Sequence, residues 1–184
     1  MNKISIIGAG SWGTTLAVLL AEKGFDVKLW ARRKELANEI EAKRENNQYL
    51  PGIKIPDNVI ADNSLKNSLE SSEMLISAVP SEFLRQTLKE IKPYFKNQII
   101  VSATKGIEHS TSKRMSQVIE DELGNAKIAV LSGPNHAEEV SRKMPTASVV
   151  ASKDKRTGKT AAEFIGTNAF KLYQLNDVAG VEIC

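Results

Sequence analysis

Short apolar runs alternate with longer amphipathic segments along the 184-residue chain. The short runs fit buried strands, whereas the longer ones repeat apolar side chains at helical spacing. Strands are predicted at 3–7, 27–30, 74–79, 99–103 and 128–131, with further candidates at 59–61, 146–152 and 169–174. Helices are predicted at 11–23, 34–46, 81–92, 115–123 and 155–165, a short one near 135, and a loop over 47–59. This order predicts an α/β protein with a mostly parallel sheet and helices on both faces.

Composition narrows the class of protein. The 25 Lys and Arg residues are scattered among 22 Asp and Glu residues, and the net charge is only +3, which argues against a nucleic-acid or membrane-surface protein. No apolar run reaches the roughly 20 residues that a membrane span needs, and the N-terminus lacks a signal-peptide pattern. One cysteine and two histidines predict neither a disulfide framework nor a metal site. We therefore expect a soluble, cytoplasmic protein.

The stretch IIGAGSWGTTLA places three glycines between the first predicted strand and the first helix. Gly8 permits a tight turn, Gly10 lets a pyrophosphate approach the backbone, and Gly13 lets the helix pack closely on the strand. The helix N-terminus then offers free N–H groups and the positive end of its dipole to phosphates. In this context the pattern is typical of a Rossmann-type, doubly wound fold that binds a dinucleotide. The alternative is a structural turn that binds no ligand.

The end of the second predicted strand bears on the choice of dinucleotide. Sites that prefer NAD usually carry an acid there to hold the ribose 2′-hydroxyl. This sequence has Arg32 and Arg33 instead, and two guanidiniums suit the 2′-phosphate of NADP. The sequence thus indicates NADP or NAD as the cofactor, with NADPH preferred. Alternatively, the two arginines only solvate the start of a helix.

Polar residues follow two further predicted strands at the same edge of the sheet. Lys105 follows the strand at 99–103, and Ser-Gly-Pro-Asn-His-Ala follows the strand at 128–131. A lysine at this edge can polarise a carbonyl group or hold a phosphate. A solvated surface lysine is the alternative, but the adjacent Gly106 and the shared edge favour a role in the site. His136 is interpreted as a residue at the start of a helix.

Five motifs in fixed order, GAGSWGTTLA, NQYLPGIKIP, SAVPS, SATKGIE and GPNHAEEV, resemble the bacterial NAD(P)-dependent glycerol-3-phosphate dehydrogenases. The resemblance runs from the first strand to the end of the chain. It implies reversible hydride transfer between sn-glycerol 3-phosphate and dihydroxyacetone phosphate, which supplies phospholipid synthesis.

The resemblance also implies roles for individual residues. Cofactor contacts fall on Ser11, Trp12, Arg32, Arg33, Pro80, Phe83, Lys105 and Ala137, in addition to the three glycines. Arg32 and Arg33 correspond to positions near the adenosine ribose, Pro80 and Phe83 to the nicotinamide side, and Trp12 to a wall beside the dinucleotide. Substrate contacts fall on Lys105, Gly133 and Asn135, although Asn135 departs from the Ser or Thr expected there.

The last residues, GVEIC, carry no helix stop signal and suggest that the sequence is cut within something larger. The resemblance places the principal proton-transferring lysine and the phosphate-binding residues beyond Cys184, in an all-helical second domain. We thus expect a dinucleotide-binding domain at 1–180, the start of the helical domain at 181–184, and no turnover by this chain alone. A homodimer of the full-length enzyme remains open. The rival hypotheses are a redox-sensing module without catalysis and another two-domain dehydrogenase, of a small oxo acid or a sugar nucleotide.

Overall fold

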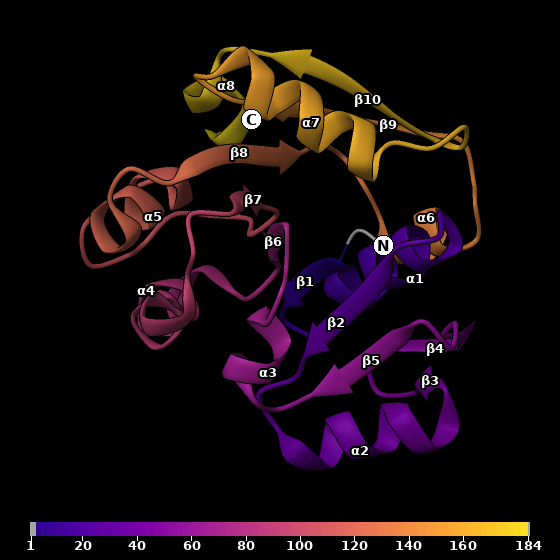
Figure 1. The fold of residues 1–184 in the computed structure, drawn as a ribbon. Coiled ribbons are helices and arrows are strands. Elements are labelled where there is room, and N and C mark those ends of the chain that lie inside the picture. The colour runs from indigo at the N-terminus through magenta and orange to yellow at the C-terminus, as the bar shows by residue number, and fades with distance from the viewer. Residues whose placement is uncertain (1–2, 184) are drawn as a thin grey trace.

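The computed structural model describes residues 3–183, and eight of their strands form one sheet (Figure 1). These strands are β1 (Lys3–Ile7), β2 (Asp26–Trp30), β5 (Val59–Asp62), β6 (Met74–Ser77), β7 (Ile99–Ser102), β8 (Lys127–Ser132), β9 (Thr146–Ala151) and β10 (Phe170–Leu175). Their spatial order is β10-β9-β8-β7-β6-β1-β2-β5. The strands from β8 to β5 are all parallel, whereas β9 pairs antiparallel with β8 and β10 pairs parallel with β9. The mostly parallel, doubly wound sheet predicted from the sequence is confirmed.

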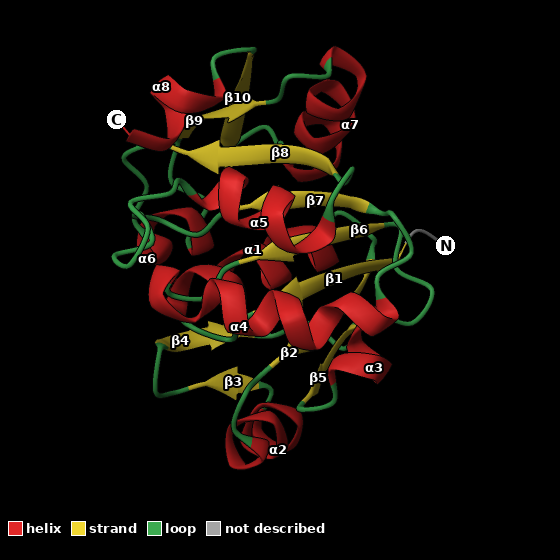
Figure 2. Ribbon diagram, turned by 90° about the vertical axis from the view of Figure 1, so that its left-hand side faces the viewer, coloured by secondary structure: helices red, strands yellow, loops and turns green. Residues whose placement is uncertain are grey.

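Helices cover both faces of this sheet (Figure 2). They are α1 (Ser11–Glu22), α2 (Lys34–Lys43), α3 (Leu65–Leu69), α4 (Ser81–Ile91), α5 (Met115–Leu123), α6 (Ala137–Ser141), α7 (Lys155–Ile165) and α8 (Val178–Ile183), with a 3₁₀ turn at Lys92–Tyr94. Buried side chains of α1, α2 and α7 belong to one apolar cluster, and those of α4 and α5 belong to another. The sheet therefore separates two cores, as expected for parallel strands that are buried on both sides.

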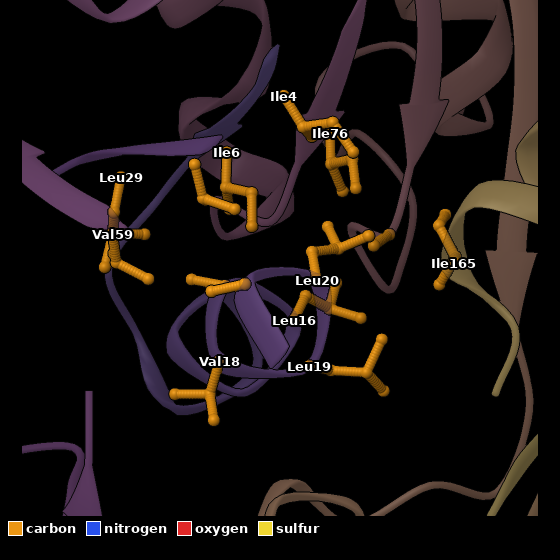
Figure 3. Close-up of a cluster of buried hydrophobic side chains, with 14 of the residues drawn as sticks. Ile4, Ile6, Leu16, Val18, Leu19, Leu20, Leu29, Val59, Ile76 and Ile165 are labelled. Atoms are coloured by element: carbon orange, nitrogen blue, oxygen red, sulfur yellow. The ribbon is translucent and has the colours of Figure 1, made fainter. Parts of the chain in front are cut away.

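Side chains of β1 point alternately to the two faces of the sheet and so contribute to both apolar cores. Ile4 and Ile6 lie in the cluster that contains α1, and Ile7 lies in the cluster on the opposite face. Figure 3 shows Ile4 and Ile6 on the side of the strand that faces Leu16 and Leu20 of α1. Since successive residues of a strand point to opposite faces, this short apolar strand is anchored from both sides and fixes where the turn after Ile7 begins.

Several helix ends match the sequence prediction. The helix α1 ends at its C-cap Lys23, and Gly24 follows with a φ of +93°, a conformation that glycine adopts without a steric penalty. The helix α4 ends at Ile91, and Pro93 falls in the 3₁₀ turn that follows. Gly124 is the C-cap of α5.

Other elements differ from the prediction. The helix predicted over 34–46 ends at Lys43, because Arg44 adopts a left-handed conformation with a φ of +51° and donates a hydrogen bond to the Val59 carbonyl at 2.7 Å. The strand β3 (Glu45–Asn46) follows and pairs antiparallel with β4 (Leu50–Lys54), so much of the predicted loop is a hairpin. The short helix α3 was not predicted; Ser64 caps it by accepting a hydrogen bond from the Asn67 amide.

The last described helix continues the packed structure. Val178 of α8 is buried against Val130 and Ala151. The domain boundary expected at 181 falls inside this helix and stays a prediction. No helix between residues 3 and 183 combines the length and apolar character needed to cross a membrane.

Candidate functional site

A cleft of about 710 Å³ lies at the carboxyl edge of the parallel strands, on both sides of the point where the strand order reverses between β1 and β6. This is the edge where open α/β sheets bind their ligands. The predicted site residues that line it are Gly8, Gly10, Ser11, Trp12, Arg32, Arg33, Pro80, Phe83, Lys105, Asn135 and Ala137. Segments that are far apart in the sequence therefore converge on one cavity. Gly13 and Gly133 lie outside its lining.

The three glycines of the N-terminal turn have different surroundings. Gly8 has a φ of +118°, and a Cβ there would lie 2.7 Å from the Ala78 carbonyl oxygen. A Cβ on Gly13 would lie 1.8 Å from the Gly8 carbonyl oxygen, so the predicted close packing of helix on strand is confirmed at this position. A Cβ on Gly10 would meet no atom within 4 Å. The protein's own packing thus requires glycine at positions 8 and 13, whereas Gly10 borders open space in the cleft.

The N-terminus of α1 faces this space without a side-chain cap. Gly10 is its N-cap residue, and the first turn contains no acidic residue. The first N–H groups of a helix need partners from outside the helix, and the positive end of the helix dipole lies at the same place. Ser11 and Trp12 bring this turn to the cleft, and Trp12 also packs edge-on against Phe170 of β10 with ring centroids 6.1 Å apart. These features suit an anionic ligand such as a pyrophosphate.

The two arginines after β2 are both exposed, and neither forms an ion pair with any residue in the described part of the chain. The Arg32 guanidinium lies 5.3 Å from the centroid of the Phe83 ring, within the range of a cation–π contact. Arg33 donates a hydrogen bond to the Gln48 side-chain oxygen. The positive charge needed for a 2′-phosphate is therefore present. The resemblance assigns Arg32 and Phe83 to opposite ends of the dinucleotide, but in this conformation they are neighbours.

Lys105 joins the ends of two strands. Its ammonium group donates a hydrogen bond of 3.3 Å to the carbonyl oxygen of Gly133, which follows β8. An ammonium group has three donors, so two remain for other partners. Lys105 is exposed and lines the cleft beside Thr104. Lys105 thus lies where it was predicted, at the same edge of the sheet as the glycine-rich turn.

The segment after β8 is held against β9. The Asn135 side chain accepts a hydrogen bond of 2.8 Å from Ser148 Oγ and donates one of 3.2 Å to the Ala147 carbonyl. A Cβ on Gly133 would lie 2.6 Å from the same Ser148 hydroxyl oxygen. Gly133 thus permits close approach of the two strands, and its expected substrate contact stays a prediction. Ala137 begins α6, and its carbonyl accepts a hydrogen bond of 3.1 Å from Thr15 of α1.

A charged network fixes the loop that follows Lys105. Arg85 of α4 forms ion pairs with Glu108 at 2.7 Å, with Asp121 at 3.0 Å and with Glu122 at 2.6 Å. Hydrogen bonds from Arg85 and Thr111 lower the pKa of Glu108 to about 2, although burial of the carboxylate opposes this shift. Because Glu108 is buried and ionised, it ties the Lys105 loop to α4 and α5.

Several lining residues were not singled out by the sequence analysis. They are Tyr49, Gln86, Glu90, Thr104 and Glu138. His136, interpreted as a helix-start residue, is the N-cap of α6 and also lines the cleft. The helical spacing of Phe83, Gln86, Thr87 and Glu90 on α4 is a signal that could have indicated a shared face. Among residues 3–183, no group of three His, Cys, Asp or Glu side chains is placed to hold a metal ion.

Comparison with known proteins places this geometry in a family. Residues 3–158 match the family described as NAD-dependent glycerol-3-phosphate dehydrogenase N-terminus. Glycerol-3-phosphate dehydrogenase [NAD(P)+] of Chlorobium phaeobacteroides is 47% identical over 98% of this chain and 55% of its own length; the enzyme of Syntrophomonas wolfei is 44% identical over 100% and 54%. The crystal structure of glycerol-3-phosphate dehydrogenase from Coxiella burnetii superposes with a TM-score of 0.95 at 37% identity, covering 100% of this chain and 56% of that one.

The chain thus spans about 55% of the length of these curated relatives. The match extends over both the glycine-rich turn and the two later motifs, which include Lys105 and Asn135. It counts against the rival hypothesis of a different two-domain dehydrogenase that shares only the glycine turn. The chain belongs to the family formed by the N-terminal part of NAD-dependent glycerol-3-phosphate dehydrogenases.

Proposed function

We propose that the cleft binds NADPH or NADH, with the diphosphate at the N-terminus of α1. The observation that carries this proposal is the open space beside Gly10, next to a helix N-terminus that no side chain caps. A phosphate oxygen there would accept hydrogen bonds from the first N–H groups of α1 and would lie at the positive end of its dipole. The volume of the cleft, about 710 Å³, is within the range of cofactor sites.

The adenosine end of the cofactor is assigned to the segment after β2. Arg32 and Arg33 would bind a 2′-phosphate through charge-assisted hydrogen bonds, so NADPH is the preferred cofactor. The contact between the Arg32 guanidinium and the Phe83 ring supports an assignment of Phe83 to this end as well, in place of the nicotinamide side that the resemblance implies. Pro80, at the N-terminus of α4, remains assigned to the nicotinamide side. Arg33 would exchange its present bond to Gln48 for one to the phosphate.

We further propose that the whole protein interconverts sn-glycerol 3-phosphate and dihydroxyacetone phosphate, and so supplies phospholipid synthesis. The bound nicotinamide supplies or accepts the hydride. Lys105 would donate a hydrogen bond to the substrate oxygen and stabilise the negative charge that develops there. Its bond to the Gly133 carbonyl holds the ammonium group at the edge of the sheet. Gly133 and Asn135 are assigned to substrate contacts on the same segment. The family resemblance assigns the principal proton transfer to a lysine after Cys184.

The proposal also covers the cellular location and the binding partners of the protein. The dispersed net charge of +3 supports an enzyme that acts on small molecules and binds no nucleic acid, and the single cysteine supports a cytoplasmic location. A homodimer of the full-length enzyme is compatible with these features.

Calorimetric titration of NADPH into the 184-residue protein tests the cofactor site. Gly10→Val should abolish binding because its side chain fills the space next to the phosphates, whereas the backbone at Gly10, with φ −75° and ψ −176°, accepts valine. Ala42→Val is the control: it introduces the same side chain at an exposed position of α2, outside the lining of the cleft, and should leave binding unchanged. Undiminished NADPH affinity in Gly10→Val would contradict the proposed phosphate site.

Turnover with dihydroxyacetone phosphate tests whether cofactor binding and catalysis depend on different parts of the full-length protein. The 184-residue protein should bind NADPH but should not oxidise it detectably, because a positioned acid–base group alone contributes about 10²–10⁴ in rate. A rate within tenfold of a full-length relative would show that the catalytic residues all lie within these 184 residues. Binding without any turnover in the full-length protein would instead support the redox-sensing alternative.

A further inference from the structure

Asn46 has an unusual position for a polar side chain. It is 1% exposed, it lies on the short strand β3, and its side-chain amide reaches the glycine-rich turn 37 residues earlier in the chain. The amide nitrogen donates one hydrogen bond to the Ala9 carbonyl at 3.0 Å and another to the Thr14 hydroxyl at 2.8 Å. The amide oxygen accepts from the backbone N–H of Tyr49 at 3.3 Å. Both donors and the acceptor of this buried amide are therefore used.

The two donor bonds bracket the segment that faces the cleft. Ala9 precedes Gly10, and Thr14 ends the first helical turn, in which its own N–H bonds to the Gly10 carbonyl. A trans peptide unit is planar, so fixing the direction of the Ala9 carbonyl also fixes the opposite direction of the Gly10 N–H. One side chain thus sets both ends of the stretch from Gly10 to Gly13.

This segment needs an external constraint because of its composition. Glycine, present within this stretch as Gly10, has more backbone freedom than any other residue type, and that freedom would have to be lost when a phosphate binds. A turn that is already ordered avoids this entropic cost at the time of binding. Asn46 supplies the order from behind the turn, since it is not among the residues that line the cleft.

We propose that Asn46 is a positioning residue for the dinucleotide phosphates, acting through the Ala9 carbonyl and the Thr14 hydroxyl without touching the cofactor. This inference rests on the proposed function of the cleft as a dinucleotide site. Asn46 links the β3–β4 hairpin to the glycine-rich turn. The loop of this hairpin also brings Tyr49 to the cleft and Gln48 to Arg33.

The chain contains a matched control for this side chain. Asn58 also donates two hydrogen bonds to backbone carbonyls, those of Ala21 at 2.8 Å and Phe25 at 2.7 Å, but at the other end of α1. Asn58→Ala removes a side-chain amide that also donates two hydrogen bonds to backbone carbonyls, but at the C-terminal end of α1, away from the glycine-rich turn. It should lower stability and leave cofactor affinity within twofold of the unmutated protein.

The test compares the dissociation constants of three ligands by calorimetry. Asn46→Ala should weaken NADPH and NADH by the same factor, about tenfold, because both carry the diphosphate. Adenosine 2′-monophosphate lacks the diphosphate, and its affinity should stay within twofold, which a general loss of structure would not allow. If Asn46→Ala does not fold, Thr14→Val removes only one acceptor and should weaken both dinucleotides about threefold.

Either of two results would overturn this inference and leave the proposed function intact. One is unchanged dinucleotide affinity in a folded Asn46→Ala protein, and the other is a loss of affinity for adenosine 2′-monophosphate as large as the loss for the dinucleotides. Where only Thr14→Val folds, unchanged dinucleotide affinity in that variant has the same meaning. Failure of the unmutated protein to bind either dinucleotide would overturn the proposed function, and this inference with it.

Discussion

Gly13→Ala should destabilise the fold although alanine is the better helix former. The added Cβ would lie 1.8 Å from the Gly8 carbonyl oxygen and 3.0 Å from the Gly8 carbonyl carbon. Both are backbone atoms, so no change of rotamer relieves the overlap, and α1 would have to separate from the turn by about 1 Å or more. Overpacking of this kind costs about 1–3 kcal/mol and occasionally more, against a gain in helix propensity of about 1 kcal/mol. Because the Cβ is fixed rigidly to the backbone of α1 and overlaps backbone atoms of Gly8, we expect a net loss of about 2 kcal/mol.

Urea unfolding followed by circular dichroism measures this loss. With a slope of about 2–3 kcal/mol per molar urea, the midpoint should fall by about 0.7–1 M at unchanged slope. Gly10→Ala is the matched variant, because its Cβ would meet no atom within 4 Å and its backbone is not strained. It should stay within about 0.5 kcal/mol of the unmutated protein. Equal midpoints for Gly13→Ala and Gly10→Ala would refute the packing argument.

Two further predictions concern charge. Replacing Arg32 and Arg33 together by alanine should weaken NADPH by about 1.5–3 kcal/mol and NADH much less, measured by calorimetry, with the exposed pair Arg142→Ala and Arg156→Ala as control; equal losses for the two cofactors would contradict the assignment. The lowered pKa of Glu108 should make part of the stability sensitive to acid: its contribution, about 2–3 kcal/mol, is complete above pH 4.5 and is lost as the pH falls toward about 2. Glu108→Gln should therefore lose less stability than the unmutated protein between pH 6 and pH 3 in urea unfolding.

The sequence predicted the parts of the structure that depend on neighbouring residues. The glycine-rich turn, the strand before it and the end of α1 at Gly24 follow from local steric rules that a single stretch of sequence contains. The common edge of Lys105 and the glycines also followed, because parallel strands place their carboxyl ends together.

Features that depend on distant partners were not predictable in this way. Arg44 ends α2 early because its side chain reaches the Val59 carbonyl, and a left-handed arginine has no signature in the local sequence. In the sequence, Asn46 is one polar residue among several, and its role depends on contacts across 37 residues. The contact of Arg32 with Phe83 likewise joins two segments that pattern analysis treats separately.

The positions of the two tryptophans have an optical consequence. Trp12 and Trp30 are the only tryptophans in the sequence, and both lie in the wall of the cleft. Trp30 is 6% exposed and its indole N–H donates to the Asn63 carbonyl at 3.0 Å, whereas Trp12 is half-buried against Phe170. Tryptophan emission of the folded protein therefore originates at the cleft alone. A reduced nicotinamide absorbs at the wavelengths where tryptophan emits. Binding of the reduced cofactor should therefore quench the intrinsic tryptophan fluorescence, which measures cofactor occupancy without an added dye.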